Sequence, residues 1–275
     1  GATTGASPKE IAENVDLIFT CLPSPAACSK VMESEDGVIA GISKGKVWLE
    51  MSTTDESEIA RLGKLIETKG AMAMDCPVSG GCHRAATGNI SIFAGGDREA
   101  FETVLPVLTK MGRRILHTGP IGSASCLKVL TNYLCSTHLA ALSEAFAVAK
   151  KAGMDMNTTY EAIRISSGNS FVHETESQLI LNGSRDVNFT MDLVVKDVGL
   201  FDKLAKLHNV PLEISPLILD IFKDGQKRYG PREFSPNIVK RLEDDCDIQI
   251  SCEGFPEELF DDEPEEPGYE VKVRK

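Results

Sequence analysis

Short apolar runs alternate with amphipathic stretches over residues 1–120, whereas the next 120 or so residues carry only helical patterns. The run 15–22 is apolar almost throughout, as in a parallel strand that is buried on both faces. Further strands are predicted at 47–51, 71–78, 90–94 and 114–117. Helices with capping residues or glycine stops are predicted at 8–13, 55–69 and 97–111. This alternation predicts a doubly wound, Rossmann-type α/β domain.

The character of the chain changes near Gly119-Pro120-Ile121-Gly122. The pattern beyond that point predicts helices at 123–152, 157–166, 190–208, 214–228 and 236–243. We therefore expect an α/β domain over 1–122 and an all-helical domain over 123–243, joined by the long helix that begins at Ser123. Residues 244–275 are acidic and contain several prolines, which predicts an extended tail on the surface or on a partner subunit.

Charge and cysteine content narrow the class of protein. The formal charge is −12, but 253–275 carries nine acidic and three basic residues and so accounts for −6 of it. No basic stripe indicates a nucleic-acid partner, and no apolar run is long enough to cross a membrane. The eight cysteines form neither a CxxC pair nor a cluster with metal-ligand spacing. We expect no metal site and a reducing compartment, the cytoplasm or the mitochondrial matrix.

The long helix contains the first candidate for chemistry. Lys128 and Glu144 are the only Lys, Arg, Asp or Glu residues between Ser123 and Ala149. A lysine in so apolar a helix is costly to bury as an ammonium ion, so its pKa is expected to fall toward neutrality, where it can transfer protons. Asn132 lies one turn further on the same face and could share a substrate oxygen with it. The alternative is a lysine whose amine reaches solvent past the helix end.

Other candidates follow strand ends. The segment 75–81 runs from a strand into Pro-Val-Ser-Gly-Gly, a turn that could bind a carboxylate or could be an ordinary glycine turn. Leu22-Pro23 and Ser52-Thr53-Thr54 follow two further strands, where ligands collect in open α/β sheets. Lys196-Asp197 places a charged pair inside an apolar helical pattern, and by itself it is typical of an exposed ion pair.

Taken together, these segments resemble the motifs of the β-hydroxyacid dehydrogenase family, the nicotinamide-dependent enzymes related to 3-hydroxyisobutyrate dehydrogenase. The resemblance covers roughly residues 6–243 and follows the family's order and approximate spacing. Its most specific parts are Pro-Val-Ser-Gly-Gly at 77–81 and the pattern of 119–132, in which a Gly-Pro-Ile-Gly turn precedes Lys-x-x-x-Asn. Agreement between separated segments outweighs any one motif.

The resemblance implies a role for each candidate. Lys128 resembles the proton-transfer lysine of the family. The residues that resemble its substrate contacts are Ser79, Gly80, Gly81 and Asn132. The residues that resemble its cofactor contacts are Leu22, Pro23, Thr53 and Lys196. The implied reaction is hydride transfer between NAD or NADP and a small 3-hydroxy acid, similar to 3-hydroxyisobutyrate or serine. A homodimer or homotetramer is expected.

Two features depart from the family pattern. The opening strand, G-x-G-x-x-G turn and helix are not seen, so we expect a chain that enters after its first βαβ unit. Cys82-His83-Arg84 follows the two glycines, where the family more often has small residues. Arg84 is expected either to meet a second acidic group of the substrate or to be a surface residue. A non-catalytic homologue that serves as an oligomerising or regulatory module is the alternative function; imine reductases and 6-phosphogluconate dehydrogenase are the enzymatic alternatives.

Overall fold

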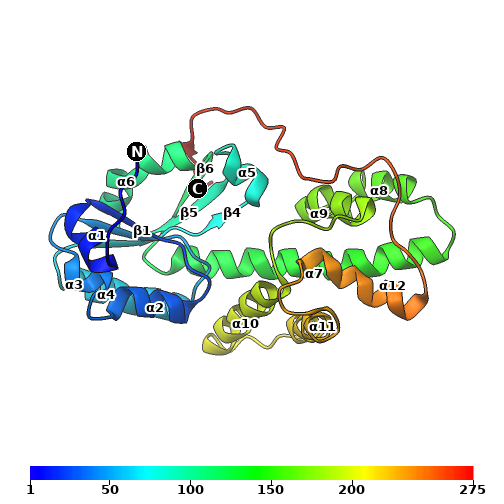
Figure 1. The fold of residues 1–275 in the computed structure, drawn as a ribbon, viewed down its shortest axis with the longest axis horizontal. Coiled ribbons are helices and arrows are strands. Elements are labelled where there is room, and N and C mark those ends of the chain that lie inside the picture. Colours follow the sequence, from blue (N-terminus) through cyan, green and yellow to red (C-terminus); the bar gives the residue numbers. More distant parts are fainter. Residues whose placement is uncertain (275) are drawn as a thin grey trace. The chain divides into compact units, whose positions relative to one another are not determined.

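The computed structural model describes residues 1–274 and contains two compact units. The first comprises Gly1–Val129 and the tail from Asp261, and the second comprises Leu130–Phe260. The first unit is built on a sheet with the strand order β1-β2-β3-β5-β6-β7, and β4 pairs with β5 (Figure 1). The strands are β1 (Leu17–Thr20), β2 (Val47–Glu50), β3 (Met72–Asp75), β4 (Val78–Ser79), β5 (Ser91–Gly95), β6 (Arg114–Gly119) and β7 (Tyr269–Glu270).

Helices cover both faces of this sheet. They are α1 (Pro8–Asn14), α2 (Pro25–Glu33), α3 (Val38–Gly41), α4 (Glu56–Glu67), α5 (Cys82–Ala86) and α6 (Arg98–Met111). Trp48 of β2 packs with the buried residues of α1 to α4. Its neighbour Leu49 points to the other face and packs with Phe101 of α6. Every residue of β2 is buried, as the apolar pattern of that segment predicts.

The sheet is mixed rather than wholly parallel. Strands β1, β2 and β3 run parallel, and so do β5, β6 and β7, but β3 pairs antiparallel with β5. The predicted strand 71–78 is interrupted, because β3 ends at Asp75 and β4 begins at Val78. Pro77 lies in the gap and has no N–H group to donate to a neighbouring strand. Both segments pair antiparallel with β5 in one continuous register, so β4 carries the chain on along β5 into the glycine turn.

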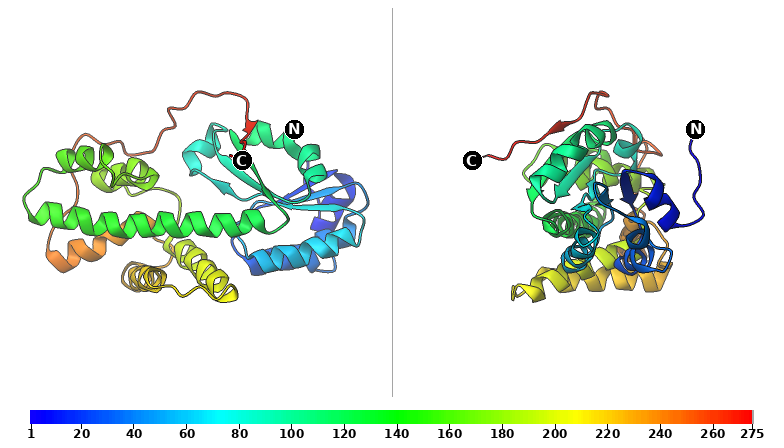
Figure 2. Two further views of the ribbon diagram at one scale, coloured as in Figure 1. Left: turned by 180° about the vertical axis from the view of Figure 1, so that it is seen from behind. Right: turned by 90° about the vertical axis from the view of Figure 1, so that its left-hand side faces the viewer.

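The second unit is entirely helical in its regular elements. Its elements are the greater part of α7 (Ser123–Lys151), then α8 (Met156–Arg164), α9 (Phe171–Asn182), α10 (Met191–Leu207), α11 (Ile214–Tyr229), η1 (Ser235–Val239) and α12 (Lys240–Cys246). Figure 2 shows α7 as one unbroken helix. The core of this unit gathers around Phe146 and Phe222, both fully buried.

Four helices have no counterpart among the predicted elements: α2, α3, α5 and α9. The ends of α9 carried a usable signal, since the Ser170 hydroxyl accepts from the His173 N–H and Gly183 ends the helix in the left-handed conformation. Six of its twelve residues are buried, and the apolar residues form no single stripe. Helix α9 is therefore not detected by a pattern that requires the apolar residues to lie on one face of the helix.

The units divide the chain differently from the predicted ranges 1–122, 123–243 and 244–275. The division lies within α7, after Val129, because the first turns of that helix pack with the α/β unit. Residues 244–260 group with the helical unit. The tail from Asp261 belongs to the α/β unit, where β7 adds a strand parallel to β6. The tail from Asp261 thus lies against its own α/β unit in this chain.

Two further observations concern the whole described chain. None of the helices within residues 1–274 has the length and apolar character needed to span a bilayer. All eight cysteines are free thiols, and Cys28 and Cys76 are buried.

Replacing Phe146 by alanine is expected to lower the free energy of unfolding by about 3–5 kcal/mol, because it leaves a cavity in the core of the helical unit. Val148 lies two residues away on α7 and is 69% exposed, so Val148→Ala is the matched control. Urea denaturation of both variants measures the difference. Equal losses would contradict this assignment of the core.

Candidate active site

The glycine turn of the α/β unit has the geometry of a tight ligand-binding loop. Ser79 ends β4 and pairs with Ser91 of β5. Gly80 and Gly81 then have φ angles of +134° and +88°, which residues with a Cβ rarely adopt. Helix α5 begins immediately afterwards, at Cys82. Both glycines are therefore required for the backbone to turn here, as the Ser-Gly-Gly sequence predicts.

A buried carboxylate links this turn to the helix that carries Lys128. Asp75 is the last residue of β3 and is fully buried. Its Oδ1 accepts from the Gly122 N–H at 2.8 Å, and its Oδ2 accepts from the Ser125 N–H at 2.6 Å. Burial raises the pKa of this carboxyl, and the two N–H donors oppose that rise. Asp75 thereby caps α7 and fixes the start of this helix against the strand that leads into the turn.

Lys128 lies in the second turn of α7 and is only 8% exposed. Its neighbours Ala124, Ser125 and Val129 are buried as well. The alternative of a lysine that extends into solvent is therefore wrong.

In the helical unit, a second buried carboxylate holds Asn132. The Asn132 Nδ2 donates to Asp197 Oδ2 at 2.6 Å, and Lys196 Nζ lies 2.9 Å from Asp197 Oδ1. Asp197 is 1% exposed, so the interpretation of Lys196-Asp197 as an exposed ion pair is wrong. The aspartate joins two predicted site residues from α7 and α10. Its signal in the sequence was its place in the apolar pattern of α10.

The candidate cofactor loops meet at the carboxyl ends of β1 and β2. The Leu22 N–H donates to Ser52 Oγ at 2.6 Å, and the Ser52 N–H donates to Glu50 Oε1 at 2.7 Å. Glu50 is fully buried and also accepts from Thr20 Oγ1 at 2.6 Å. Pro23 follows Leu22 and is exposed. The two loops are thus tied to each other through Glu50 and Ser52, neither of which was predicted to belong to the site.

These loops fit a nicotinamide dinucleotide. They lie at the carboxyl edge of adjacent parallel strands, the place where open α/β sheets bind such ligands. Thr53 is half-buried there. Among the described residues 1–274, Thr54 Oγ1 is one of the few buried polar atoms without a hydrogen-bond partner, as expected for a hydroxyl that serves a ligand.

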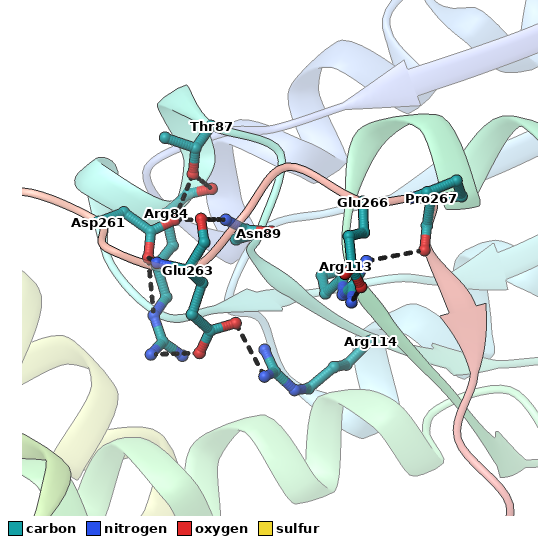
Figure 3. A network of polar contacts seen from close by, with 9 residues as sticks. All are labelled: Arg84, Thr87, Asn89, Arg113, Arg114, Asp261, Glu263, Glu266 and Pro267. Carbon is teal, nitrogen blue, oxygen red and sulfur yellow. Dashed lines mark hydrogen bonds and ion pairs between the residues drawn. The ribbon is translucent and has the colours of Figure 1, made fainter.

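Arg84 is held by the acidic tail. Its side chain is 23% exposed and is engaged by the tail, with Nη2 lying 2.9 Å from Glu263 Oε1 (Figure 3). Asp261 Oδ1 lies 3.9 Å from Arg84 Nε. Arg84 thus differs from an ordinary solvated surface residue, and its contact with a second acidic group of the substrate stays a prediction.

Comparison with known proteins agrees with this geometry. The family model described as the NAD binding domain of 6-phosphogluconate dehydrogenase matches residues 1–119. The model described as NAD-binding of NADP-dependent 3-hydroxyisobutyrate dehydrogenase matches residues 122–242. The 2-(hydroxymethyl)glutarate dehydrogenase of Eubacterium barkeri is 32% identical over 252 residues, which cover 91% of this chain and 84% of that enzyme. The chain belongs to the β-hydroxyacid dehydrogenase family.

Other members of the family match over a similar length. The mitochondrial 3-hydroxyisobutyrate dehydrogenase of Mus musculus is 29% identical and is covered over 72% of its length by 86% of this chain. A crystal structure of 3-hydroxyisobutyrate dehydrogenase from Salmonella typhimurium superposes with a TM-score of 0.77 at 27% identity, covering 86% of this chain and 82% of that one. This β-hydroxyacid dehydrogenase is therefore an NAD(P)-dependent enzyme of the 3-hydroxyacid class.

The matches also bear on two sequence-based expectations. The first family model aligns from residue 1, so the expectation that the opening βαβ unit is missing has no support. An imine reductase from Myxococcus stipitatus shares the fold, with a TM-score of 0.54 at 13% identity, and at that identity the likeness extends to the fold alone.

Asp75→Asn is expected to lower kcat and to cost about 1–3 kcal/mol of stability, because an amide donor would then face a backbone N–H at the start of α7. Steady-state kinetics and thermal unfolding measure the two effects. Asp155→Asn is the control, since Asp155 caps α8 in the same way but lies in the helical unit at an exposed position. An Asp75→Asn enzyme with wild-type kcat would contradict the positioning role.

Proposed function

We propose that this chain oxidises a small 3-hydroxy acid to the corresponding 3-oxo acid, and that Lys128 is the residue that transfers the proton. The observation that carries the proposal is the burial of Lys128 on a helix whose first turn is tied by Asp75 to the strand leading into the Ser-Gly-Gly turn. Asp75 therefore fixes the position of both the helix that carries Lys128 and the strand that leads into the candidate carboxylate-binding turn. The matches to dehydrogenases of this class support the same reaction.

The substrate class follows from the chemistry that the relatives' substrates have in common. The names of these relatives specify 2-(hydroxymethyl)glutarate, 3-hydroxyisobutyrate and L-serine. Each compound has a hydroxyl on the carbon β to a carboxylate. We assign the carboxylate of the substrate to Ser79, Gly80 and Gly81, whose hydroxyl and backbone N–H groups are suited to an anion.

Each predicted site residue has a separate role in the proposed reaction. In the oxidation, the neutral amine of Lys128 takes the hydroxyl proton as the C–O single bond becomes a carbonyl. Asn132 directs its NH2 group at Asp197, which leaves its carbonyl oxygen as the side suited to accept from the substrate hydroxyl. When bound, NAD or NADP accepts the hydride that leaves the β-carbon. Leu22, Pro23, Thr53 and Lys196 are assigned to hold that cofactor.

We also propose a homodimer or homotetramer. The helical unit exposes large apolar side chains, which isolated soluble domains usually cover. They include Leu134, Ile165 and Leu217.

Lys128→Ala is expected to lower kcat by about 10²–10⁴-fold, because it removes the group that takes the proton. Calorimetry should show that the variant still binds NAD or NADP. Lys110→Ala is the control, since Lys110 is an exposed lysine in the last turn of α6 in the same unit. Near-normal turnover by Lys128→Ala would overturn the assignment, and a wild-type chain that binds no cofactor would favour a non-catalytic module.

Ser79→Ala is expected to raise KM for the hydroxy acid about tenfold or more while changing kcat less, because a hydrogen bond to a charged group contributes about 1.5–3 kcal/mol. Initial-rate kinetics with 3-hydroxyisobutyrate measures both constants. Ser57→Ala, at an exposed position of α4, is the matched control. An unchanged KM would mean that the turn does not bind the substrate.

A further inference from the structure

The acidic tail places two carboxylates on an arginine beside the glycine turn (Figure 3). The side chain of Asp261 is 2% exposed and accepts hydrogen bonds from Thr87 Oγ1 and, at 2.6 Å, from Asn89 Nδ2. These hydrogen bonds lower the pKa of Asp261 against the opposing effect of its burial, so it is ionised at neutral pH. The tail is therefore anchored on the segment that follows α5.

Glu263 joins two arginines. Its carboxylate lies 2.9 Å from Arg84 Nη2 through Oε1 and 2.8 Å from Arg114 Nη2 through Oε2. Figure 3 shows the Glu263 side chain between the two guanidinium groups. Two positive and two negative charges, those of Arg84, Arg114, Asp261 and Glu263, meet in this cluster. The tail therefore neutralises a positive region that the α/β unit would otherwise present.

Arg84 lies directly against the turn. A Cβ placed on Gly80 would come within 3.2 Å of Arg84 Cδ, so the arginine stem packs over the first glycine. Arg84 is also only three residues beyond Gly81. His83 of α5 lies against Gly81 as well, but burial and the charge of Arg84 lower the pKa of its imidazole. Arg84 is therefore the side chain of α5 that would offer a positive charge to an acid bound at the turn. A guanidinium binds a carboxylate through two parallel hydrogen bonds and is well suited to a second acidic group.

We propose that Glu263, together with Asp261, is a specificity-determining element that occupies Arg84 and so selects monocarboxylic over dicarboxylic 3-hydroxy acids. A substrate with a second carboxylate would have to displace Glu263 from Arg84. The displaced carboxylate would lose partners and lie near another anion, which is costly in a partly buried cluster. This inference rests on the proposed function, because it assumes that the first carboxylate binds at the turn.

The test compares two acids that differ in a second carboxylate, 3-hydroxyisobutyrate and 2-(hydroxymethyl)glutarate. In Glu263→Gln, and more so in Asp261→Asn/Glu263→Gln, the ratio of kcat/KM for the diacid to that for the monoacid should rise about tenfold or more. The rise should come mainly from a lower KM for the diacid. Adding Arg84→Gln should abolish it, since that change removes the partner of the second carboxylate.

The tail offers a matched control. Glu266 forms an ion pair with Arg113, the residue adjacent to Arg114. Glu266→Gln therefore removes a tail ion pair of the same kind and should leave the substrate ratio unchanged. If both variants shifted the ratio equally, tail docking in general would be responsible and the proposal would be wrong.

Two further outcomes separate this inference from the proposed function. A wild-type enzyme that oxidises 3-hydroxyisobutyrate and shows the same ratio as Glu263→Gln would overturn the specificity role alone, as would a wild-type preference for the diacid. A wild-type enzyme that oxidises neither acid would refute the proposed function. In that case calorimetric titration with glutarate still tests Arg84, since Glu263→Gln should bind glutarate about tenfold more tightly than the wild type. Equal affinities would overturn the inference.

Discussion

The arrangement of the α/β unit depends on buried carboxylates at the ends of neighbouring strands. Asp75 and Glu50 are register partners on β3 and β2, and each ends its strand. A buried carboxylate is stable only where hydrogen-bond donors surround it. Each of these two carboxylates therefore accepts hydrogen bonds from nearby N–H and hydroxyl groups. Asp75 accepts hydrogen bonds from the first turn of α7. Glu50 accepts hydrogen bonds at the ends of β1 and β2, where the two loops begin. The sheet edge is thereby ordered in advance of any ligand.

The same principle operates in the helical unit and at the tail. Asp197 is buried and holds the amide of Asn132, so the orientation of that amide is set by a residue that need not touch the substrate. At the tail, Glu263 and Asp261 engage Arg84 and hold its charge in a neutral cluster. In each case an acidic side chain fixes the position of a polar or charged neighbour. The chemistry of the proposed reaction is left to Lys128 and the turn.

Much of the fold follows from the local sequence because its determinants are local. The continuous apolar character of β2 predicts a strand buried on both faces, and capping residues such as Ser7 and Asp55 predict where helices begin. The long α7 was predicted to within a residue or so at each end. The site candidates Lys128 and Ser79 could be selected because an isolated charge and a glycine pair are visible in one dimension.

The remaining features required tertiary structure, because they depend on partners far apart in the chain. No sequence pattern shows that Asp75 would cap a helix that begins 48 residues later, or that β5 would pair antiparallel with β3. The acidic composition of the tail predicted an extended segment with two possible places. The pairing of β7 with β6, and of Glu263 with Arg84, became visible only in the tertiary structure. The sequence by itself therefore determined most of the strands and helices and indicated the candidate site residues, because both depend on local patterns. Long-range hydrogen bonds and ion pairs, which only the tertiary structure contains, determined how those side chains are held.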